Sequence, residues 1–349
     1  MLDRSKIKIA IHHRAGSFSD KWIRWCIDNH ISFKIVNAYD SNIINELKDC
    51  TGFMWHWHHE KYADQLFARQ LILSLETCGK KVFPNVATSW HFDDKLGQKY
   101  LFEALSIPTP KSMIFYDKTA ALNWINSAQL PLVFKLRGGA GSNNVSLVSS
   151  YAMAVTLIKK AFTKGFLAVN LKNVAYQSIW EYRRNKSLRN LIRSIYHWLR
   201  WAFNITTTKL DMMPRQLGYI ILQEFIPNNK YDDRLVVIGS RCFCVRRICR
   251  SNDFRASGSG EKLYDHNIFP IKSIELAYKV AKTLKLQSVA MDIVYDDQGN
   301  PLVVEISYGF VTGSSYEDCD GYYDNNHNWI DVKVRPEVFM MEDFIAGFE

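Results

Sequence analysis

The sequence predicts a mixed α/β protein of two or three domains, and two patterns lead to this prediction. Short apolar runs alternate with helical segments over the first hundred residues, as they do in a parallel sheet with crossover helices. Residues 217–310 instead form a series of strand-like runs with one helical segment between them. The chain has 349 residues, enough for separate domains of ~100–200 residues each.

Three segments are expected along the chain: an N-terminal α/β domain (1–108), a smaller segment (109–216) and a C-terminal segment (217–349). Pro108 and Pro110 interrupt any helix at the first boundary. The expected strands include 7–12, 33–39, 52–58, 81–85, 112–116 and 132–136, and the expected helices lie near 20–28, 63–76, 119–127 and 271–284.

The composition is ordinary for a folded protein. Hydrophobic residues make up 47% of the chain and charged residues 23%, which excludes a disordered chain. No stretch approaches the ~20 apolar residues that cross a bilayer, and the first residues lack a signal-peptide core. The seven cysteines are odd in number and scattered, so we expect a reducing compartment, the cytoplasm. Buried thiols are expected at Cys242, Cys244 and Cys249, with a zinc site as the alternative.

A basic amphipathic helix is predicted at 186–203. Apolar side chains recur at helical spacing, while the other face carries Lys186, Arg189, Arg193 and Arg200. This segment concentrates the positive excess of a chain whose net charge is +9. Three interpretations stay open: a solvated helix packed on the protein, a helix on a membrane surface, or contact with an acidic partner. Because no nucleic-acid-binding motif accompanies it, we expect no nucleic acid partner.

A hairpin with two facing carboxylates is predicted by the segment AMDIVYDDQGNPLVVEISYGF. A turn centred between Gln298 and Gly299 pairs Asp292 directly with Glu305. Ser307 shares their face, because side chains two apart on a strand point the same way. Two acids this close destabilise a sheet unless a positive charge lies with them, and Mg²⁺ prefers such oxygen ligands. The alternative is an exposed hairpin edge with solvated acids.

Two further elements place charge beside predicted strands. The hairpin DDRLVVIGSRCFCVRR sets Asp232 opposite Arg247, with Arg234 on the same face; a cross-strand ion pair worth under ~1 kcal/mol is the simplest interpretation. The loop RGGAGSNN follows the strand that ends near Lys135. Its amides and the lysine charge suit phosphate oxygens. The loop matches neither the P-loop nor the Rossmann fingerprint, so a plain glycine-rich turn is the alternative.

The order of these elements resembles the ATP-grasp superfamily, most closely the branch of glutathione synthetase and the ribosomal-protein glutamate ligase (RimK-like). A lysine before the proline-marked boundary, a strand lysine with a glycine-rich loop, the stretch ILQEFIP, an Asp-x-Arg strand and a closing Asp…Glu-x-Ser hairpin follow one another. The resemblance runs from about 7 to 310, apart from an insert near 166–216. It implies an ATP-grasp fold behind a Rossmann-like N-terminal domain.

The resemblance also implies roles for individual residues. ATP is expected to contact Lys95, Lys135, Gly138, Gly139, Gly141, Ser142, Gln223, Glu224, Phe225 and Ile226. Mg²⁺ or Mn²⁺ is expected at Asp292, Glu305 and Ser307. The family usually has Asn where Ser307 stands, so a second metal ion is in doubt. Arg255, with Arg234 or Arg247, is expected to hold the transferred phosphate or an acyl phosphate.

The activity that the resemblance implies is an ADP-forming ligase. A carboxylate attacks the γ-phosphate of ATP, and an amine or related nucleophile captures the acyl phosphate. The expected partners are a small-molecule or glycan-linked carboxylate and an amine acceptor, in surface polysaccharide or peptide-like metabolite synthesis. The enzyme is expected in the cytoplasm, with peripheral contact at the inner face of the membrane as one option. A kinase and a non-catalytic ATP-binding scaffold remain alternatives.

Substrate contacts are expected where the first strands of the N-terminal domain end. Ligands of open α/β sheets bind beyond the carboxyl ends of strands. His12 and Arg14 follow the first strand, and His56 and His58 follow the third. The alternatives are a strand end with partly exposed rings and a zinc site formed by His56, His58 and His59.

Overall fold

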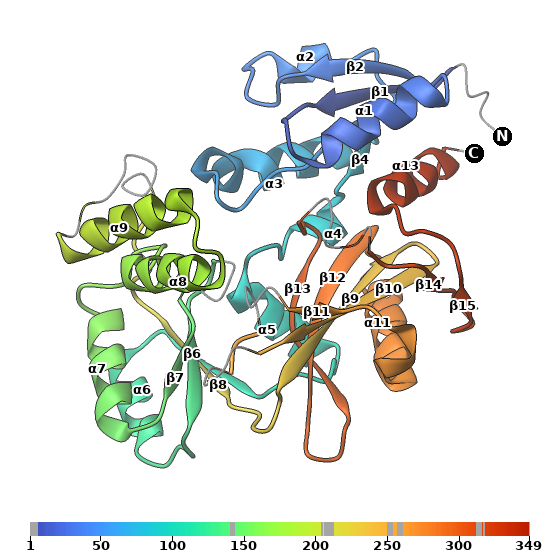
Figure 1. The fold of residues 1–349 in the computed structure, drawn as a ribbon. Coiled ribbons are helices and arrows are strands. Elements are labelled where there is room, and N and C mark those ends of the chain that lie inside the picture. Colours follow the sequence, from blue (N-terminus) through green and yellow to red (C-terminus); the bar gives the residue numbers. More distant parts are fainter. Residues whose placement is uncertain are drawn as a thin grey trace. The chain divides into compact units, whose positions relative to one another are not determined.

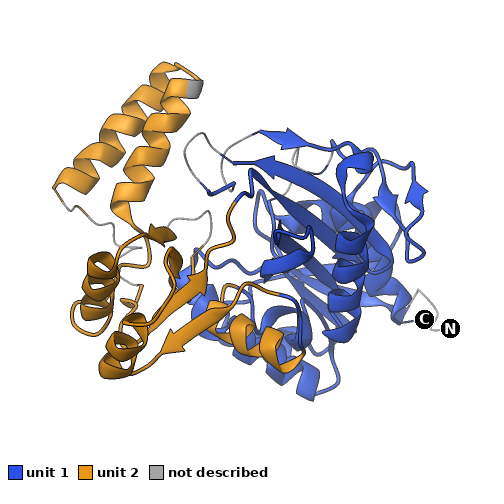
Figure 2. Cartoon of the chain, turned by 90° about the horizontal axis from the view of Figure 1, so that it is seen from below, with its two compact units in different colours: residues 1–92, 106–108, 228–349 blue, residues 93–105, 109–227 orange. Residues whose placement is uncertain are grey.

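The computed structural model describes residues 6–139, 144–203, 205, 213–249, 254–256, 261–311, 316 and 318–348. The chain forms two compact units: unit 1 comprises residues 1–92, 106–108 and 228–349, and unit 2 comprises residues 93–105 and 109–227 (Figure 2). Helices, one parallel sheet and two antiparallel sheets confirm the predicted mixed α/β class. The division into three continuous segments stays a prediction.

The N-terminal part of unit 1 is a four-stranded parallel sheet in the order β2-β1-β3-β4 (Figure 1), as the alternation of strands and helices predicts. Its elements are β1 (Lys8–His12), α1 (Phe18–Asp28), β2 (Ser32–Val36), α2 (Ile43–Glu46), β3 (Gly52–Trp55), α3 (Tyr62–Thr77), β4 (Lys81–Phe83) and α4 (Val86–Ser89). Strands β2 and β3 end three residues earlier than expected, so residues 37–39 and 56–58 lie in loops at the carboxyl edge of the sheet.

The C-terminal part of unit 1 is a seven-stranded antiparallel sheet. Its order is β13-β12-β9-β10-β14-β15, and β11 pairs with β10. The elements are β9 (Tyr231–Ile238), β10 (Arg241–Ile248), β11 (Lys262–Leu263), the 3-10 helix η2 (His266–Ile268), α11 (Ile271–Thr283), β12 (Ser288–Tyr295), β13 (Pro301–Ser307), β14 (Tyr322–Tyr323), β15 (Trp329–Ile330) and α13 (Pro336–Ala346). Helix α11 packs against β9 and β12 and buries Ile274, Ala277 and Val280.

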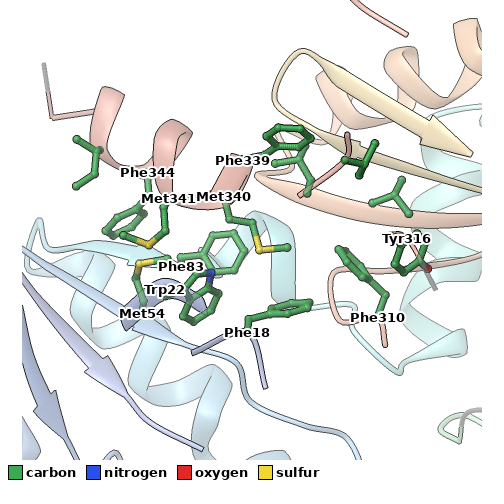
Figure 3. Close-up of a cluster of buried hydrophobic side chains, with 14 of the residues drawn as sticks. Phe18, Trp22, Met54, Phe83, Phe310, Tyr316, Phe339, Met340, Met341 and Phe344 are labelled. Atoms are coloured by element: carbon green, nitrogen blue, oxygen red, sulfur yellow. The ribbon is translucent and has the colours of Figure 1, made fainter. Parts of the chain in front are cut away.

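One hydrophobic core joins the two sheets of unit 1 (Figure 3). Helix α13, near the C-terminal end, contributes Phe339 and Met341 to this core. Trp22 of α1 and Val236 of β9 belong to the same buried cluster. One face of the N-terminal parallel sheet therefore shares its packing with the C-terminal sheet. The other face has its own buried cluster, which includes Ala10, Phe53 and Val82.

Unit 2 is built on a four-stranded antiparallel sheet in the order β5-β8-β6-β7. Its elements are α5 (Lys95–Ala104), β5 (Ser112–Phe115), α6 (Lys118–Ile125), β6 (Leu132–Lys135), β7 (Ser146–Val148), α7 (Tyr151–Ala161), α8 (Leu171–Arg184), α9 (Leu188–Ala202) and β8 (Ile220–Glu224). Leu132, Phe134 and Leu222 form a core with apolar residues of α6 and α7, so these helices cover one face of the sheet.

The insert between β7 and β8 includes a pair of packed helices, α8 and α9. Ser187 caps α9 by accepting a hydrogen bond from the amide of Asn190, and Asn170 caps α8 in the same way. Ser194 donates a hydrogen bond of 2.7 Å to the carbonyl of Ser178 and so ties the two helices together. The helix predicted at 186–203 is confirmed as α9.

Candidate active site

The β12–β13 hairpin of unit 1 pairs Asp292 with Glu305, as predicted. Nearer the turn the register is one residue different, because Ile293 pairs with Val303. The predicted centre of the turn was therefore wrong, and a β-bulge that leaves Val304 unpaired restores the expected partner. Without this bulge Asp292 would face Val304, and Glu305 would point to the opposite face of the sheet.

One face of this sheet changes from apolar to charged along the strands. On β9, Val236 and Ile238 belong to the hydrophobic core. Asp232 and Arg234 precede them at spacings of two residues and therefore point to the same side. The strand pairings add Arg247 of β10 opposite Asp232, together with Asp292 of β12 opposite Arg234. The charged end of this face is the candidate catalytic surface, and it includes Glu305 by its pairing with Asp292.

Two guanidinium groups hold the carboxylate of Asp292. Arg234 donates from Nε and Nη2 at 2.7 and 2.9 Å, and Arg247 Nη2 lies 2.9 Å from the same carboxylate. Arg247 also binds Asp232 through two hydrogen bonds of 2.6 and 2.5 Å. The predicted pair of Asp232 and Arg247 is confirmed. The pair belongs to a buried network, because the Arg247 side chain is only 9% exposed.

The environment of this network shifts the pKa values of its two aspartates in opposite directions. Burial alone would raise the pKa of Asp292, but Arg234 and then Arg247 outweigh it, so the pKa lies well below its usual range. Burial raises the pKa of Asp232, because the attraction of Arg247 compensates only part of the lost hydration. Asp292 is therefore ionised at neutral pH, and part of its compensating charge comes from the protein itself.

The oxygen atoms of this surface fit a hard cation. Asp292, Glu305 and Ser307 share one face of the hairpin. Ser307 Oγ donates its proton to the carbonyl of Gly309 at 2.5 Å, which leaves the hydroxyl lone pairs available as a ligand. Such oxygen donors suit Mg²⁺ or Mn²⁺, which usually complete their coordination with water and substrate phosphates.

Lys262 and Tyr316 also belong to the charged surface, although no sequence pattern indicated them. Lys262 pairs with Arg247 across β10 and β11, and burial lowers its pKa. Tyr316 is buried, and its hydroxyl accepts a hydrogen bond from Arg234. Arg255 lies in the short described segment 254–256, and its predicted phosphate contact stays a prediction.

In unit 2, acidic residues anchor the base of the glycine-rich loop. The amide of Gly139 donates to Asp93 Oδ1 at 2.7 Å, and Lys95 Nζ donates to the Gly139 carbonyl at 3.1 Å. A Cβ atom at Gly138 would lie 2.8 Å from Asp93 Oδ2, so a side chain here would have to displace the Asp93 carboxylate. Arg137 forms an ion pair of 2.5 Å with Asp94. Lys95, Gly138 and Gly139 therefore lie together, as expected of a phosphate-binding loop.

The far end of the loop is also held. Asn144 donates a hydrogen bond of 2.7 Å from its side-chain amide to the carbonyl of Ala168. The other two predicted loop contacts, Gly141 and Ser142, lie outside the described residues.

Lys135 and Gln223 share the face of the unit 2 sheet that points away from α6 and α7. This follows from the alternation of side chains, since Phe134 and Leu222 belong to the core beneath those helices. Lys135 is buried and pairs with Ile221. The Gln223 side chain donates to Ser112 Oγ at 2.9 Å and so links β8 to the neighbouring strand β5.

The end of β8 exposes Glu224, one of the residues expected to contact ATP. The Glu224 side chain is exposed at the last residue of the strand, and its amide donates to the Lys111 carbonyl at 2.8 Å. Phe225 and Ile226 follow directly and are half-buried. A contact between ATP and this stretch stays a prediction.

The four residues expected to contact substrate lie at the carboxyl edge of β1 and β3. His56 is buried and stacks on Phe18, with ring centroids 3.7 Å apart. The His58 ring lies 6.2 Å from that of His56. His12 is also buried, so partly exposed rings were the wrong expectation for His12 and His56. Arg14 is half-buried.

This histidine edge adjoins the β12–β13 hairpin within unit 1. The hydroxyl of Tyr308 donates to the carbonyl of Trp57 at 2.6 Å. A Cβ atom at Gly309 would lie 3.6 Å from His56 Nε2. The end of β13, which carries Ser307, therefore meets the loop after β3. The described residues contain no cluster of three His, Cys, Asp or Glu side chains that could hold a metal ion, which contradicts both zinc alternatives.

Comparisons with known proteins agree with this arrangement. Residues 206–316 match the model of the RimK-like ATP-grasp domain. A RimK domain protein of Sphaerobacter thermophilus is 16% identical, with 97% of this chain and 100% of that chain covered and a TM-score of 0.56. The D-alanine–D-alanine ligase of Bacillus anthracis is 12% identical over 98% and 96% of the two chains, with a TM-score of 0.56.

The ATP-grasp ligase PsnB, in complex with a minimal precursor, has the same TM-score of 0.56 at 12% identity over 98% and 99% of the two chains. A search of curated proteins found no match. At these identities the similarity shows the fold of the chain, and the site residues rest on the geometry described above.

Proposed function

We propose, from the premise that this chain has the ATP-grasp fold and carries a RimK-like ATP-grasp domain, that it is an ADP-forming, ATP-dependent carboxylate ligase. The observation that carries the proposal is the pairing of Asp292 with Glu305 on a buried charged surface. A β-bulge is needed to bring these two acids to one face, which a purely structural hairpin would not require. A non-catalytic scaffold has no use for this arrangement.

The residues of each unit would perform separate parts of the reaction. In unit 2, Lys135, Lys95 and the amides of the glycine-rich loop would bind the phosphates of ATP. In unit 1, Asp292 and Glu305 would hold Mg²⁺ or Mn²⁺, with Ser307 as a weaker ligand. When bound, the metal ion would neutralise phosphate charge.

The arginines of unit 1 are held in fixed positions by aspartates. Arg234 and Arg247 are fixed by bidentate ion pairs to Asp292 and Asp232, so little reorganisation opposes their electrostatic action. Together with Arg255 they would stabilise an acyl phosphate through charge-assisted hydrogen bonds. A carboxylate oxygen would attack the γ-phosphorus and release ADP, and an amine would then attack the acyl carbon and release phosphate.

The substrates proposed are a carboxylic acid, small or glycan-linked, and an amine. Two structural neighbours act on related groups by name: one ligates D-alanine to D-alanine, and PsnB binds a peptide precursor. Which carboxylic acid binds would depend on the charged groups at the substrate edge of unit 1.

A binding and turnover assay with Mg²⁺ and ATP tests the proposal. Lys135→Ala should lose ATP affinity, because Lys135 would contact phosphate. Glu305→Ala should retain ATP binding but lose turnover. Tight ATP binding by the wild type, without turnover in mixtures of carboxylates and amines, would contradict ligase activity and favour the scaffold.

A further inference from the structure

Three histidines at the substrate edge use the same ring nitrogen as a hydrogen-bond acceptor. Nδ1 of His12 accepts from the backbone amide of Ala38 at 3.0 Å. Nδ1 of His56 accepts from the amide of Phe18 at 3.2 Å. Nδ1 of His58 accepts from the amide of Glu60 at 3.2 Å. A backbone amide can only donate, so Nδ1 carries no proton in any of the three rings.

The proton of each neutral ring must then sit on Nε2. Burial lowers the pKa of His12 and His56, and it lowers that of His58 to about 4, so all three rings are neutral at pH 7. The His12 ring also has a hydrogen bond with the backbone of Val36, so the proton donors open to a ligand are those of His56 and His58. His56 and His58 therefore each carry an N–H donor at Nε2.

Arg14 adds a positive charge to these donors. Its charge contributes to lowering the pKa of His12, His56 and His58, so it lies near all three rings. Its Nε atom is buried and has no hydrogen-bond partner among the described residues, and the guanidinium forms no ion pair with a described carboxylate. A buried guanidinium nitrogen without an acceptor costs free energy, unless a ligand supplies that acceptor.

The neighbouring Asp64 does not supply this acceptor to Arg14. Asp64 is buried, and its two carboxylate oxygens accept hydrogen bonds from the Tyr39 hydroxyl and from the amide of His58 at 2.7 Å. Glu60 lies 4.0 Å from His58 Nδ1, and its side chain is 75% exposed. Lys61 adds a further positive charge near His12. The edge therefore offers hydrogen-bond donors and positive charge, while the buried Asp64 carboxylate is already bound by Tyr39 and the His58 amide.

We propose that Arg14, His56 and His58 bind an oxyanion of the substrate, separate from the carboxylate that reacts with ATP. The class of substrate is thus an acid with a second anionic group, either a carboxylate or a phosphate. A ligand made only of acceptors matches a site made only of donors. The proposal rests on the proposed function only in treating this anion as part of a ligase substrate.

Anion binding in the absence of ATP tests the subsite. Protein labelled with ¹⁵N histidine is titrated with inorganic phosphate and, separately, with succinate. The His12, His56 and His58 rings should show the Nε2–H tautomer, and at least one anion should shift the Nε2 signals of His56 and His58. A stronger response to phosphate identifies a phosphoryl group, and a stronger response to succinate identifies a carboxyl group.

Variants at Arg14 decide whether the guanidinium is part of the site. Arg14→Gln should weaken anion binding about tenfold or more. Arg14→Lys keeps the positive charge and should give an intermediate loss, which distinguishes lost binding from misfolding. Arg24→Gln, at an exposed arginine of α1, is the matched control and should bind as the wild type does. Equal affinity in wild type and Arg14→Gln, no response to either anion, or Nδ1–H tautomers would overturn the proposal. Because no ATP is present, such a failure is independent of whether the chain is a ligase.

A separate observation concerns α9, whose apolar face is not the face that packs on α8. Ser194 is its one buried side chain among the described residues and bonds to α8. Large apolar residues recur every three or four positions on another side of the helix and are 40–73% exposed: Leu188, Ile192, Ile195, Leu199 and Phe203. The helix therefore packs on α8 through another side and leaves these apolar residues exposed.

Charge flanks the apolar face of α9. Arg189 is exposed, and the Arg193 side chain is 57% exposed beside Glu181. The segment from Lys186 to Phe203 contains basic residues but no acid. No helix in the described part of the chain is long and apolar enough to cross a membrane. An amphipathic helix of this kind suits the interface of a bilayer with anionic headgroups.

We propose that α9 binds the surface of an anionic membrane. Co-sedimentation with vesicles of phosphatidylcholine containing phosphatidylglycerol should capture the wild type, and pure phosphatidylcholine should capture far less. The pair Ile192→Ser with Ile195→Ser should lose binding, as should the pair Lys186→Glu with Arg189→Glu. The matched control, Leu66→Ser with Leu73→Ser on exposed positions of α3, should bind normally.

Two results would overturn this membrane proposal. One is a wild type that binds neither kind of vesicle, or variants of α9 that bind as the wild type does. The other is a dimer in sedimentation that dissociates in the Ile192→Ser, Ile195→Ser variant, since a second copy of the chain would then cover the apolar face.

Discussion

Replacing Asp292 by asparagine separates the structural role of the charged surface from its chemistry. The Asp292 side chain is 18% exposed and accepts three charge-assisted hydrogen bonds, two from Arg234 and one from Arg247. Asparagine has nearly the same shape but only one acceptor oxygen and no charge. Arg247 keeps its contact with Asp232, whereas Arg234 loses its carboxylate partner.

The magnitude follows from burial. Removing one partner of a buried ion pair costs about 3–5 kcal/mol, and losing two charge-assisted hydrogen bonds of about 1.5–3 kcal/mol each gives the same range. We therefore expect Asp292→Asn to lower the free energy of unfolding by about 3–5 kcal/mol. Asp28→Asn removes an exposed ion pair with Arg24 and should cost less than about 1 kcal/mol.

Urea denaturation at several pH values measures both effects. The pKa of Asp292 is lowered in the folded protein, so its stabilisation is present above the unfolded pKa of about 4 and is lost as the pH falls below it. The difference between wild type and Asp292→Asn should therefore be full at pH 7 and should shrink in acid. A difference below about 1 kcal/mol at pH 7 would refute the buried network.

Three further changes test other parts of the account. Lys135→Met should reduce ATP affinity about tenfold or more in a calorimetric titration, because methionine has no charge to offer the phosphates; an unchanged affinity would contradict a phosphate contact. Gly138→Ala should displace Asp93 from the Gly139 amide, which removes a hydrogen bond worth about 1 kcal/mol of stability. ATP turnover in a coupled assay should slow about fivefold. An unchanged rate would show that the loop base is not constrained. His58→Gln should flatten the decline of thermal stability between pH 6.5 and about 4, because the unfolded histidine takes up a proton that the folded ring resists; parallel decline in both proteins would contradict the neutral ring.

Local patterns in the sequence predicted the paired strands well. Alternation of side chains placed Asp292 opposite Glu305 and Asp232 opposite Arg247, and both pairs are confirmed. The turn position was wrong, because a bulge has no signature in hydrophobic alternation. The contact of Arg234 with Asp292 also escaped prediction, since it depends on β12 lying beside β9, two strands that are distant in the sequence.

Burial and helix orientation were harder to predict, because they depend on partners far along the chain. His56 is covered by Phe18, and its loop meets Tyr308 from the other end of the chain. The sequence showed that α9 is amphipathic, yet it could not show that Ser194, and not the apolar face, packs on α8. The core role of α13 likewise depends on contacts with Trp22 and other residues of α1.

Identification of the reaction products tests the central proposal most directly. Wild-type protein with Mg²⁺, ATP, a mixture of carboxylic acids and hydroxylamine should release ADP and form a hydroxamate, because hydroxylamine captures an acyl phosphate. Glu305→Ala should form neither. Release of AMP and pyrophosphate, or ADP with a phosphorylated alcohol and no hydroxamate, would contradict an acyl-phosphate ligase.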